Sequence, residues 1–308
     1  MDQSTKTLPQ PAVQLRSQRQ RLWRTFIRNR TTIVGFVLVI LIVLMSVFAD
    51  DWFIALLQGR KAQPLLAPFD PAKQDTRNRL ETPSKGHPMG LDTYGRDILS
   101  RIIYGGRVSL LVGICSVLLG GTIGTFLGIV AGYSGGKIEN TIMRSVDVLM
   151  AFPSLIMGLM VLAVLGSGIS KMIIAIGIML SPSFARVVHS STLAVKENEY
   201  VEAARSIGVG QFRMLRLHIL PNVLGEVTVL ASIWTANAIR IEANLSFIGL
   251  GVSPPTPAWG TMIRDGTQHL TNAPWISVFP GLAILITVFA FNLMGDGLRD
   301  ILDPRLQV

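Results

Sequence analysis

Residues 31–49 constrain this chain more than any other stretch, because nineteen consecutive residues carry no charge between Arg30 and Asp50. A bilayer core about 30 Å thick requires roughly 20 apolar residues in a helix. Composition agrees, since 49% of the residues are hydrophobic and only 15% are charged, whereas about 25% of a soluble domain is charged. We therefore expect an integral membrane protein whose first transmembrane helix is residues 31–49. A cleaved signal peptide is the alternative, but its apolar region is shorter and lies nearer the N-terminus.

Further apolar stretches predict five more transmembrane helices, which gives an all-α protein with six spans. The stretches are Leu110–Ala131, Leu149–Gly166, Met172–Val188, Val223–Ala238 and Val278–Met294. Some of them contain proline or a charge, namely Pro182, Arg186, Glu226 and Pro280. Such residues are tolerated where neighbouring helices or a wet cavity satisfy the polar groups. We identify no soluble domain, no low-complexity tract and no short-period repeat.

The distribution of charge predicts the orientation. Residues 1–30 hold seven of the lysines and arginines and a single acid, Asp2, and this bias places the N-terminus in the cytoplasm. The net charge of +9 is thus assigned to membrane topology, although it is also compatible with nucleic-acid binding. Within this basic tail, Leu22, Trp23, Phe26 and Ile27 fit one face of an interfacial helix, and a solvated tail is the alternative.

Six spans with a cytoplasmic N-terminus divide the chain into five parts. Residues 1–30 are a cytoplasmic tail, 31–49 the first span, and 50–100 an external loop rich in proline and glycine. Residues 101–298 hold the other five spans and a cytoplasmic loop, 189–222, and residues 299–308 form a cytoplasmic tail. The external loop is too long for a simple connection and reads as an extended, turn-rich segment.

The sequence shows no pattern of a catalytic or metal site. The four histidines are scattered without ligand spacing, and the single cysteine, Cys115, lies in the second span, so no internal disulfide is possible. Residues 131–138 approach a phosphate-binding P-loop, but Ala131 replaces its first glycine and Ile138 replaces the Ser/Thr after the lysine. We therefore expect no enzymatic activity and no bound cofactor on this chain.

The long cytoplasmic loop carries the most informative pattern. Glu202–Ile207 favours a short helix with small side chains on one side, and Gly208 is expected to end it with a positive φ. Phe212–Leu217 favours a second short helix that ends near Pro221. Small residues allow another surface to approach closely, so the loop is expected to dock a partner; an ordinary surface helix is the alternative.

The same loop resembles the Glu-Ala-Ala loop of ABC-importer permeases. Glu202, Ala203 and Ala204 are followed by Gly208 and then by Leu220-Pro221, with His218 at a position where that family usually has an apolar residue. Three further stretches extend the likeness to the C-type permease of the dipeptide and oligopeptide, glutathione or nickel importers. They are Gly90–Arg101, Pro254–Gly260 and Phe291–Asp300.

This resemblance implies a type I ABC importer transmembrane domain in a bacterial cytoplasmic membrane, with both termini cytoplasmic. It implies a heterodimer with a second related permease, two ATPase subunits that hold ATP and Mg²⁺, and an external solute-binding protein. The solute is a peptide or similar small molecule, and nucleic acid is not a partner. The implied coupling residues are Glu202, Ala203, Ala204, Gly208, Leu220 and Pro221.

Charged residues inside a membrane are candidates for function. Arg240 and Glu242 are expected on different helix faces near the outer end of the fifth span, either paired with another helix or lining the passage. Ser246, Gly249 and Gly251 suggest irregular backbone at an external gate. An ion-coupled secondary transporter is the alternative function, but no pair of broken helices in matching halves accompanies Glu226 and Glu242. A membrane scaffold would leave the loop motif unexplained.

Overall fold

The computed structural model describes residues 29–59 and 62–302, and within these ranges the fold is all-helical, with only two isolated β-bridges. Five long apolar helices are able to cross a membrane. They are α2 (Arg30–Val47), α4 (Ile98–Ser134), α7 (Ile169–Lys196), α12 (Trp275–Leu302), and a continuous helix of α9 (Gln211–Met214), the π turn η1 (Leu215–Ile219) and α10 (Leu220–Ile248). The shorter helices are α3 (Trp52–Gln58), α5 (Gly136–Ala151), α6 (Ser154–Leu165), α8 (Glu199–Ser206), α11 (Trp259–Gly266) and η2 (Thr267–His269).

The predicted third span, residues 149–166, is not a single helix. Helix α5 ends at Ala151 and α6 begins at Ser154, with a bend of 95° between them. Pro153 explains the break, because the residue before a proline is pushed toward extended backbone, and Phe152 has φ −81° and ψ 133°. Counted together, α5 and α6 form one broken span, so the described chain has up to six crossings.

Helices α4 and α7 form the centre of the bundle and approach each other along a ladder of glycines, Gly120, Gly124, Gly128 and Gly132. A Cβ on Gly128 would lie 2.6 Å from the carbonyl oxygen of Ala185 on α7. Small residues at every fourth position allow such close packing of helices in a membrane.

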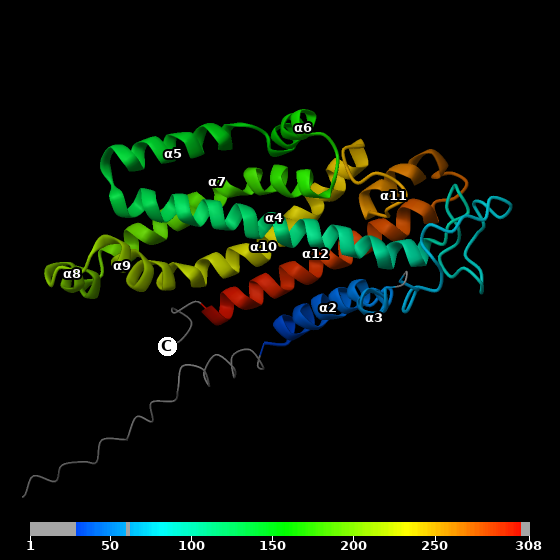
Figure 1. The fold of residues 1–308 in the computed structure, drawn as a ribbon, viewed down its shortest axis with the longest axis horizontal. Helices are drawn as coiled ribbons and strands as arrows, with labels where there is room; N and C mark the ends of the chain where they lie inside the picture. Colours follow the sequence, from blue (N-terminus) through cyan, green and yellow to red (C-terminus); the bar gives the residue numbers. More distant parts are fainter. Residues whose placement is uncertain (1–28, 60–61, 303–308) are drawn as a thin grey trace, which may run out of the picture.

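Helices α2, α10 and α12 pack beside this pair, and the helices run roughly side by side along the long axis of the molecule (Figure 1). Glycines again make the contacts close: a Cβ on Gly35 of α2 would lie 2.6 Å from the backbone nitrogen of Met294 of α12. Asn29, the N-cap of α2, donates a hydrogen bond of 3.0 Å from Nδ2 to Oδ2 of Asp300 on α12. The start of α2 and the end of α12 therefore lie at the same end of the bundle.

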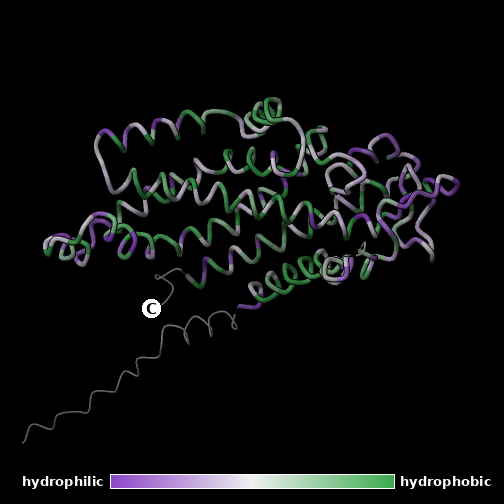
Figure 2. The backbone as a smooth tube through the Cα atoms, in the orientation of Figure 1, coloured by the Kyte–Doolittle hydropathy of each residue, from purple (hydrophilic) through white to green (hydrophobic). Residues whose placement is uncertain are grey.

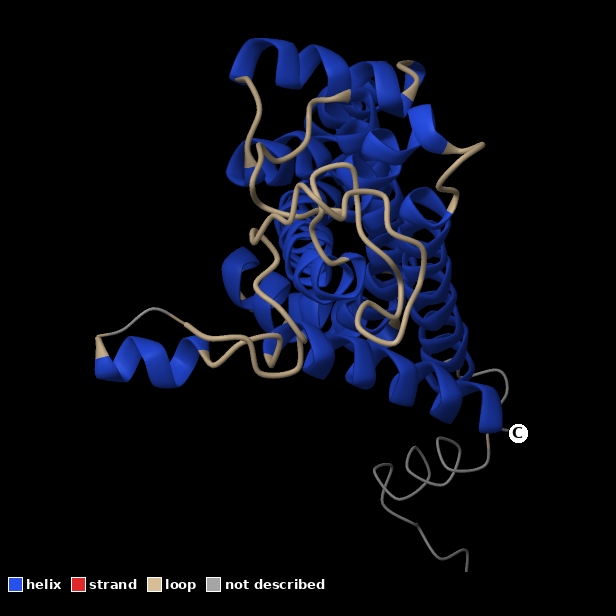
Figure 3. Cartoon of the chain, turned by 90° about the vertical axis from the view of Figure 1, so that its right-hand side faces the viewer, coloured by secondary structure: helices blue, strands red, loops and turns tan. Residues whose placement is uncertain are grey.

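The two ends of the bundle differ in structure. At one end lie α8 and α9 (Figure 1). At the other end lie α11 and the segment of residues 62–97, called here the cap segment, whose loops cover the ends of the helices (Figure 3). Hydrophobic residues dominate the long helices between the two ends, and hydrophilic residues gather in the cap segment (Figure 2).

Candidate functional site

Helix α8 and the turn after it form the core of the predicted coupling loop. Helix α7 runs on to Lys196 and α9 begins at Gln211, so the part between long helices is shorter than the predicted 189–222. Gly208 ends α8 with φ +80°, as expected from the sequence. Its N–H bonds the carbonyl of Arg205 at 3.0 Å, and Val209 N–H bonds that of Ala204 at 3.1 Å. This pair of bonds is the Schellman ending of a helix, which needs a left-handed residue.

The predicted alanines of α8 differ in exposure, since one is buried and the other is exposed. Ala204 is buried together with Val201 in an apolar cluster that also contains Met214 and Ile219, whereas Ala203 and Glu202 are exposed. The small side chain of Ala204 is thus required by packing within the chain, and it does not form the outer surface expected from the sequence. Of the predicted residues within α8, Ala203 and Glu202 remain candidates for contact with a partner.

The exposed surface of the coupling loop is apolar at two places that the sequence analysis did not single out. Ile207 is 83% exposed and Phe212 is 77% exposed, and both flank the turn at Gly208. Helix α8 also contacts α4 at this end of the bundle. The guanidinium of Arg205 lies 5.9 Å from the ring centroid of Tyr133 at the end of α4. His218, the departure from the family pattern, has its ring centroid 6.3 Å from that of Tyr200.

The second loop helix does not end near Pro221, which corrects the sequence expectation. It continues through the π turn η1 into α10, and Leu220 N–H bonds the carbonyl of Leu215 across this turn. Proline lacks an N–H and clashes with the carbonyl four residues before it, and a π turn is one way to accommodate such a clash. Leu220 and Pro221 thereby join the coupling loop rigidly to the membrane helix α10.

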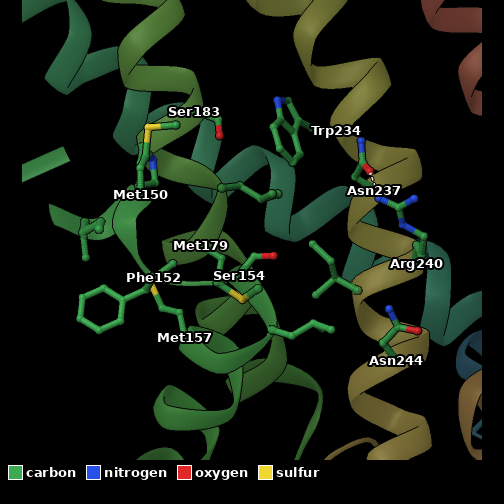
Figure 4. A pocket seen from close by; sticks show the side chains of 15 residues that line it. Met150, Phe152, Ser154, Met157, Met179, Ser183, Trp234, Asn237, Arg240 and Asn244 are labelled. Carbon is green, nitrogen blue, oxygen red and sulfur yellow. Dashed lines mark hydrogen bonds between the residues drawn. The ribbon is translucent and has the colours of Figure 1, made fainter. Parts of the chain in front are cut away.

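A cavity of about 400 Å³ lies in the membrane part of the bundle, where α5 and α6 break and α7 and α10 pass. Figure 4 shows Asn237, Arg240 and Asn244 in succession along α10, with Met150 and Phe152 on the other side. The break at Pro153 opens this space. Of the predicted pathway residues, only Arg240 lines it.

Arg240 and Glu242 point in different directions, as expected from their spacing. Arg240 is exposed and donates a hydrogen bond of 2.6 Å to Oδ1 of Asn237. Glu242 is fully buried, and its carboxylate accepts hydrogen bonds from Ser109 Oγ on α4 at 2.8 Å and from Ser246 Oγ at 2.7 Å. Glu242 therefore ties α10 to α4 and takes no part in the cavity.

The predicted gate residues Ser246, Gly249 and Gly251 lie together at the end of α10, away from the cavity. Gly249 ends the helix with φ +105°, and Ser246 is buried. Ser246 also contacts α11, since a Cβ on Gly260 would lie 2.8 Å from the Ser246 Cβ. The structure thus gives these residues a packing role where α10 meets α11.

The cap segment and the start of α4 hold a group of buried charges within the stretch Gly90–Arg101. Asp92 is 4% exposed and accepts hydrogen bonds from the backbone N–H of Tyr94 at 2.8 Å and from Nε of Arg96 at 2.7 Å. Arg101 is also buried, with its Nε 3.5 Å from Asp92. Asp97 caps α4 by accepting from the N–H of Ser100 at 2.8 Å. These contacts fix the cap segment to the start of α4.

The second and third family motifs pack against α4 and α2, respectively. Trp259 of α11 is 1% exposed and donates from Nε1 to the carbonyl of Ile102 at 2.9 Å. Gly297 lies against Thr32 of α2. Within the described residues, no group of three or more His, Cys, Asp or Glu side chains is placed to hold a metal ion.

Trp234, Asn237 and Asn244 are candidate site residues that the sequence reasoning missed. With Arg240 they recur on one face of α10 at helical spacing. The available signal was a pair of amides, Asn237 and Asn244, two helical turns apart. It was missed because the predicted fifth span ended at Ala238, before Asn244.

Comparisons with known proteins identify the fold and relatives of this chain. Residues 124–308 match the family described as binding-protein-dependent transport system inner membrane component, and residues 17–83 match the N-terminal transmembrane domain of oligopeptide transport permease C. A glutathione transport system permease protein of Pectobacterium atrosepticum is 40% identical over 294 residues, 95% of this chain and 93% of the relative. Its counterpart in Escherichia coli O6:K15:H31 is 41% identical over 295 residues, 96% of this chain and 93% of the relative.

Two solved structures share the fold. The inward-facing MetNI methionine ABC transporter aligns with a TM-score of 0.56 and 19% identity, over 66% of this chain and 97% of that chain. An amino acid ABC transporter with histidines aligns with a TM-score of 0.50 and 16% identity, over 64% of this chain and 91% of that chain.

Proposed function

We propose that this chain carries its solute past the α10 face of the membrane cavity. The chain belongs to the family of binding-protein-dependent transport system inner membrane components and is a permease subunit of an ABC importer. The coupling loop at the end of α7 drives this passage. The observation that carries the proposal is the exposure of Ile207 and Phe212 beside Ala203, at the end of the bundle that leads directly into α10.

The coupling loop is suited to receive a partner. An apolar side chain left in water gains about 1.5–3 kcal/mol when it is buried, so Ile207 and Phe212 favour docking against another protein surface. The exposed small side chain of Ala203 lets that surface approach α8 closely, and Glu202, in the first turn of α8, offers a negative charge to a basic group. The partner in this proposal is an ATPase subunit.

Movement of that partner reaches the cavity through one rigid path. Helix α9, the π turn and α10 are continuous, so a displacement at Phe212 is transmitted to Trp234, Asn237 and Arg240. Alternating access then consists of a rigid-body change between two packed arrangements. ATP and Mg²⁺ act on two separate ATPase subunits, beneath a heterodimer of this chain with a second permease.

The remaining partners follow from the same family. An external solute-binding protein delivers a peptide or similar small solute such as glutathione, which the relatives transport by name. The lysines and arginines of residues 1–30 support an orientation in which both termini and the coupling loop are cytoplasmic. Cysteine labelling at residue 75 from outside and at residue 210 from inside checks this orientation; labelling of both from the same side contradicts it.

The coupling role is tested by variants of the exposed face of α8. Ala203→Trp, Glu202→Lys and Gly208→Val should abolish uptake in cells while the chain still accumulates in the membrane. Recovery of ATPase subunits with the tagged chain in mild detergent should fall in parallel. Arg299→Gln, at the end of α12, is the matched control and should keep both. Normal uptake by all three variants would refute the coupling assignment.

A further inference from the structure

Arg240 lies within the long apolar helix of α9, η1 and α10 and has no acidic partner among the described residues. It is about 12 Å along the helix axis from Ile248, the last residue of α10, and an arginine within a membrane-spanning helix is costly unless it is paired or faces a wet cavity. Within the described residues no carboxylate lies within 4.0 Å of its guanidinium, and the residues that line the cavity include no acid. Among the described residues, its guanidinium donates a hydrogen bond to Oδ1 of Asn237.

Arg186, a second arginine near the same cavity, differs from Arg240 because it is paired with an acid. Arg186, one turn beyond Pro182 on α7, forms an ion pair with Asp147 of α5. Its charge is therefore neutralised within the chain, whereas the charge of Arg240 is available to a solute. Glu242 is the acid nearest to Arg240 in sequence, but it is turned away and bonded to two serines.

The side chains around Arg240 complete a site for an anionic group. Asn237 and Asn244 lie on the same face of α10 and line the same cavity (Figure 4), and their amides are able to donate hydrogen bonds to a carboxylate. The guanidinium is planar and matches a carboxylate with two parallel bonds. Opposite it stand Met150, Met157 and Met179, whose flexible side chains adapt to varied apolar groups.

We propose that Arg240, with the amides of Asn237 and Asn244, binds the carboxylate of the solute as it crosses the membrane, while the methionine wall accepts the rest of the molecule without strong selection. The chemical class of the solute is thus an organic anion or zwitterion with a free carboxylate. This inference rests on the proposed role of the cavity as the solute pathway.

The test measures the charge selectivity of the cavity in the assembled transporter. In a Cys115→Ser background, Ser183→Cys places a reporter thiol in the cavity wall. Its rate of modification is measured with an anionic (sulfonatoethyl) and a cationic (trimethylammonioethyl) methanethiosulfonate reagent. Arg240→Gln should lower the anionic-to-cationic rate ratio by about tenfold, and Arg264→Gln, which removes a charge from α11, should leave it unchanged. An unchanged ratio in Arg240→Gln would overturn the proposal.

A second arm identifies the carboxylate. Tri-alanine should protect the reporter thiol from modification better than tri-alanine amide does, and Arg240→Gln should abolish this difference. Equal protection by the two peptides, or a difference that survives in Arg240→Gln, would also overturn the proposal. ATPase subunits should still be recovered with Arg240→Gln. Their absence from the unmodified chain as well would refute the transporter function itself, which separates the two failures.

Discussion

The cap segment and the coupling loop occupy opposite ends of the same bundle and are built on opposite principles. In the cap segment, charged side chains are buried and paired within the chain. Asp92, for example, accepts hydrogen bonds from Arg96 and from backbone N–H groups. In the coupling loop, apolar side chains such as Ile207 are exposed, and the described part of the chain leaves them largely uncovered. The buried charges of the cap segment are therefore paired within the chain, whereas we propose that a partner covers the exposed apolar side chains of the coupling loop.

This comparison predicts that substitutions at the two ends separate stability from assembly. The largest loss of stability is expected from Asp92→Ala, because it leaves the buried guanidiniums of Arg96 and Arg101 without their anion. Breaking a buried ion pair costs about 3–5 kcal/mol. The melting temperature of the purified chain in detergent should fall sharply. Asp70→Ala, at an exposed position of the same segment, is the control, and an equal effect of both would mean that the cap is not closed on itself.

Ala204→Trp is expected to destabilise the chain by about 1–3 kcal/mol through overpacking, because Ala204 lies in the cluster with Val201 and Met214. Ala203→Trp, one residue away on the exposed face, should leave the melting temperature nearly unchanged and still prevent recovery of ATPase subunits. Thermal unfolding and co-purification, measured on the same samples, distinguish the two alanines. Similar melting temperatures for both variants would contradict the assignment of their faces.

Gly208→Val should cost on the order of 1 kcal/mol, because φ +80° is unfavourable for a residue with a Cβ. Space is not the cause, since a Cβ on Gly208 would meet no atom within 4 Å. Gly208→Asn, which tolerates a left-handed backbone better, should recover most of the stability and the uptake. If asparagine is as damaging as valine, the backbone explanation is wrong.

The smallest effect on stability is expected from Ile207→Ser, below about 0.5 kcal/mol, because the side chain is 83% exposed. Its effect on assembly should be much larger, with a clear loss of ATPase subunits from the purified complex. The measurement is the subunit ratio after size-exclusion chromatography in mild detergent. An unchanged ratio would show that this exposed residue is not part of the docking surface.

The sequence predicted the features that depend on neighbouring residues. Most of the uncharged run of residues 31–49 lies in α2, which ends at Val47, and Gly208 ends α8 with the expected positive φ. The family motifs also predicted the membrane fold. Such features depend only on the residues of one short stretch, so the sequence of that stretch is enough to predict them.

Features that depend on tertiary contacts were predicted poorly. Pro153 breaks a span and Pro182 does not, and the difference lies in how freed carbonyls are satisfied. Pro182 cannot bond the carbonyl of Ile178, but Ser181 Oγ donates to it at 3.0 Å, and α7 continues. Likewise, Ala203 and Ala204 are the same residue type. They differ only in that Ala204 lies on the side of α8 that packs against the apolar cluster of Val201, Met214 and Ile219. The cavity itself arises from the break between α5 and α6 and has no signature in any one segment.

The π turn between α9 and α10 has a consequence for the phase of the helix. A π turn holds one residue more than an α turn, and one residue corresponds to about 100° of rotation in an α-helix. The extra residue within Leu215–Ile219 therefore sets the angle between the face that carries Phe212 and the face that carries Arg240. Deleting this residue would keep the side chains of both faces, but it would rotate one face relative to the other by about 100°. The length of this single turn thus sets the angle between the proposed docking surface and the cavity.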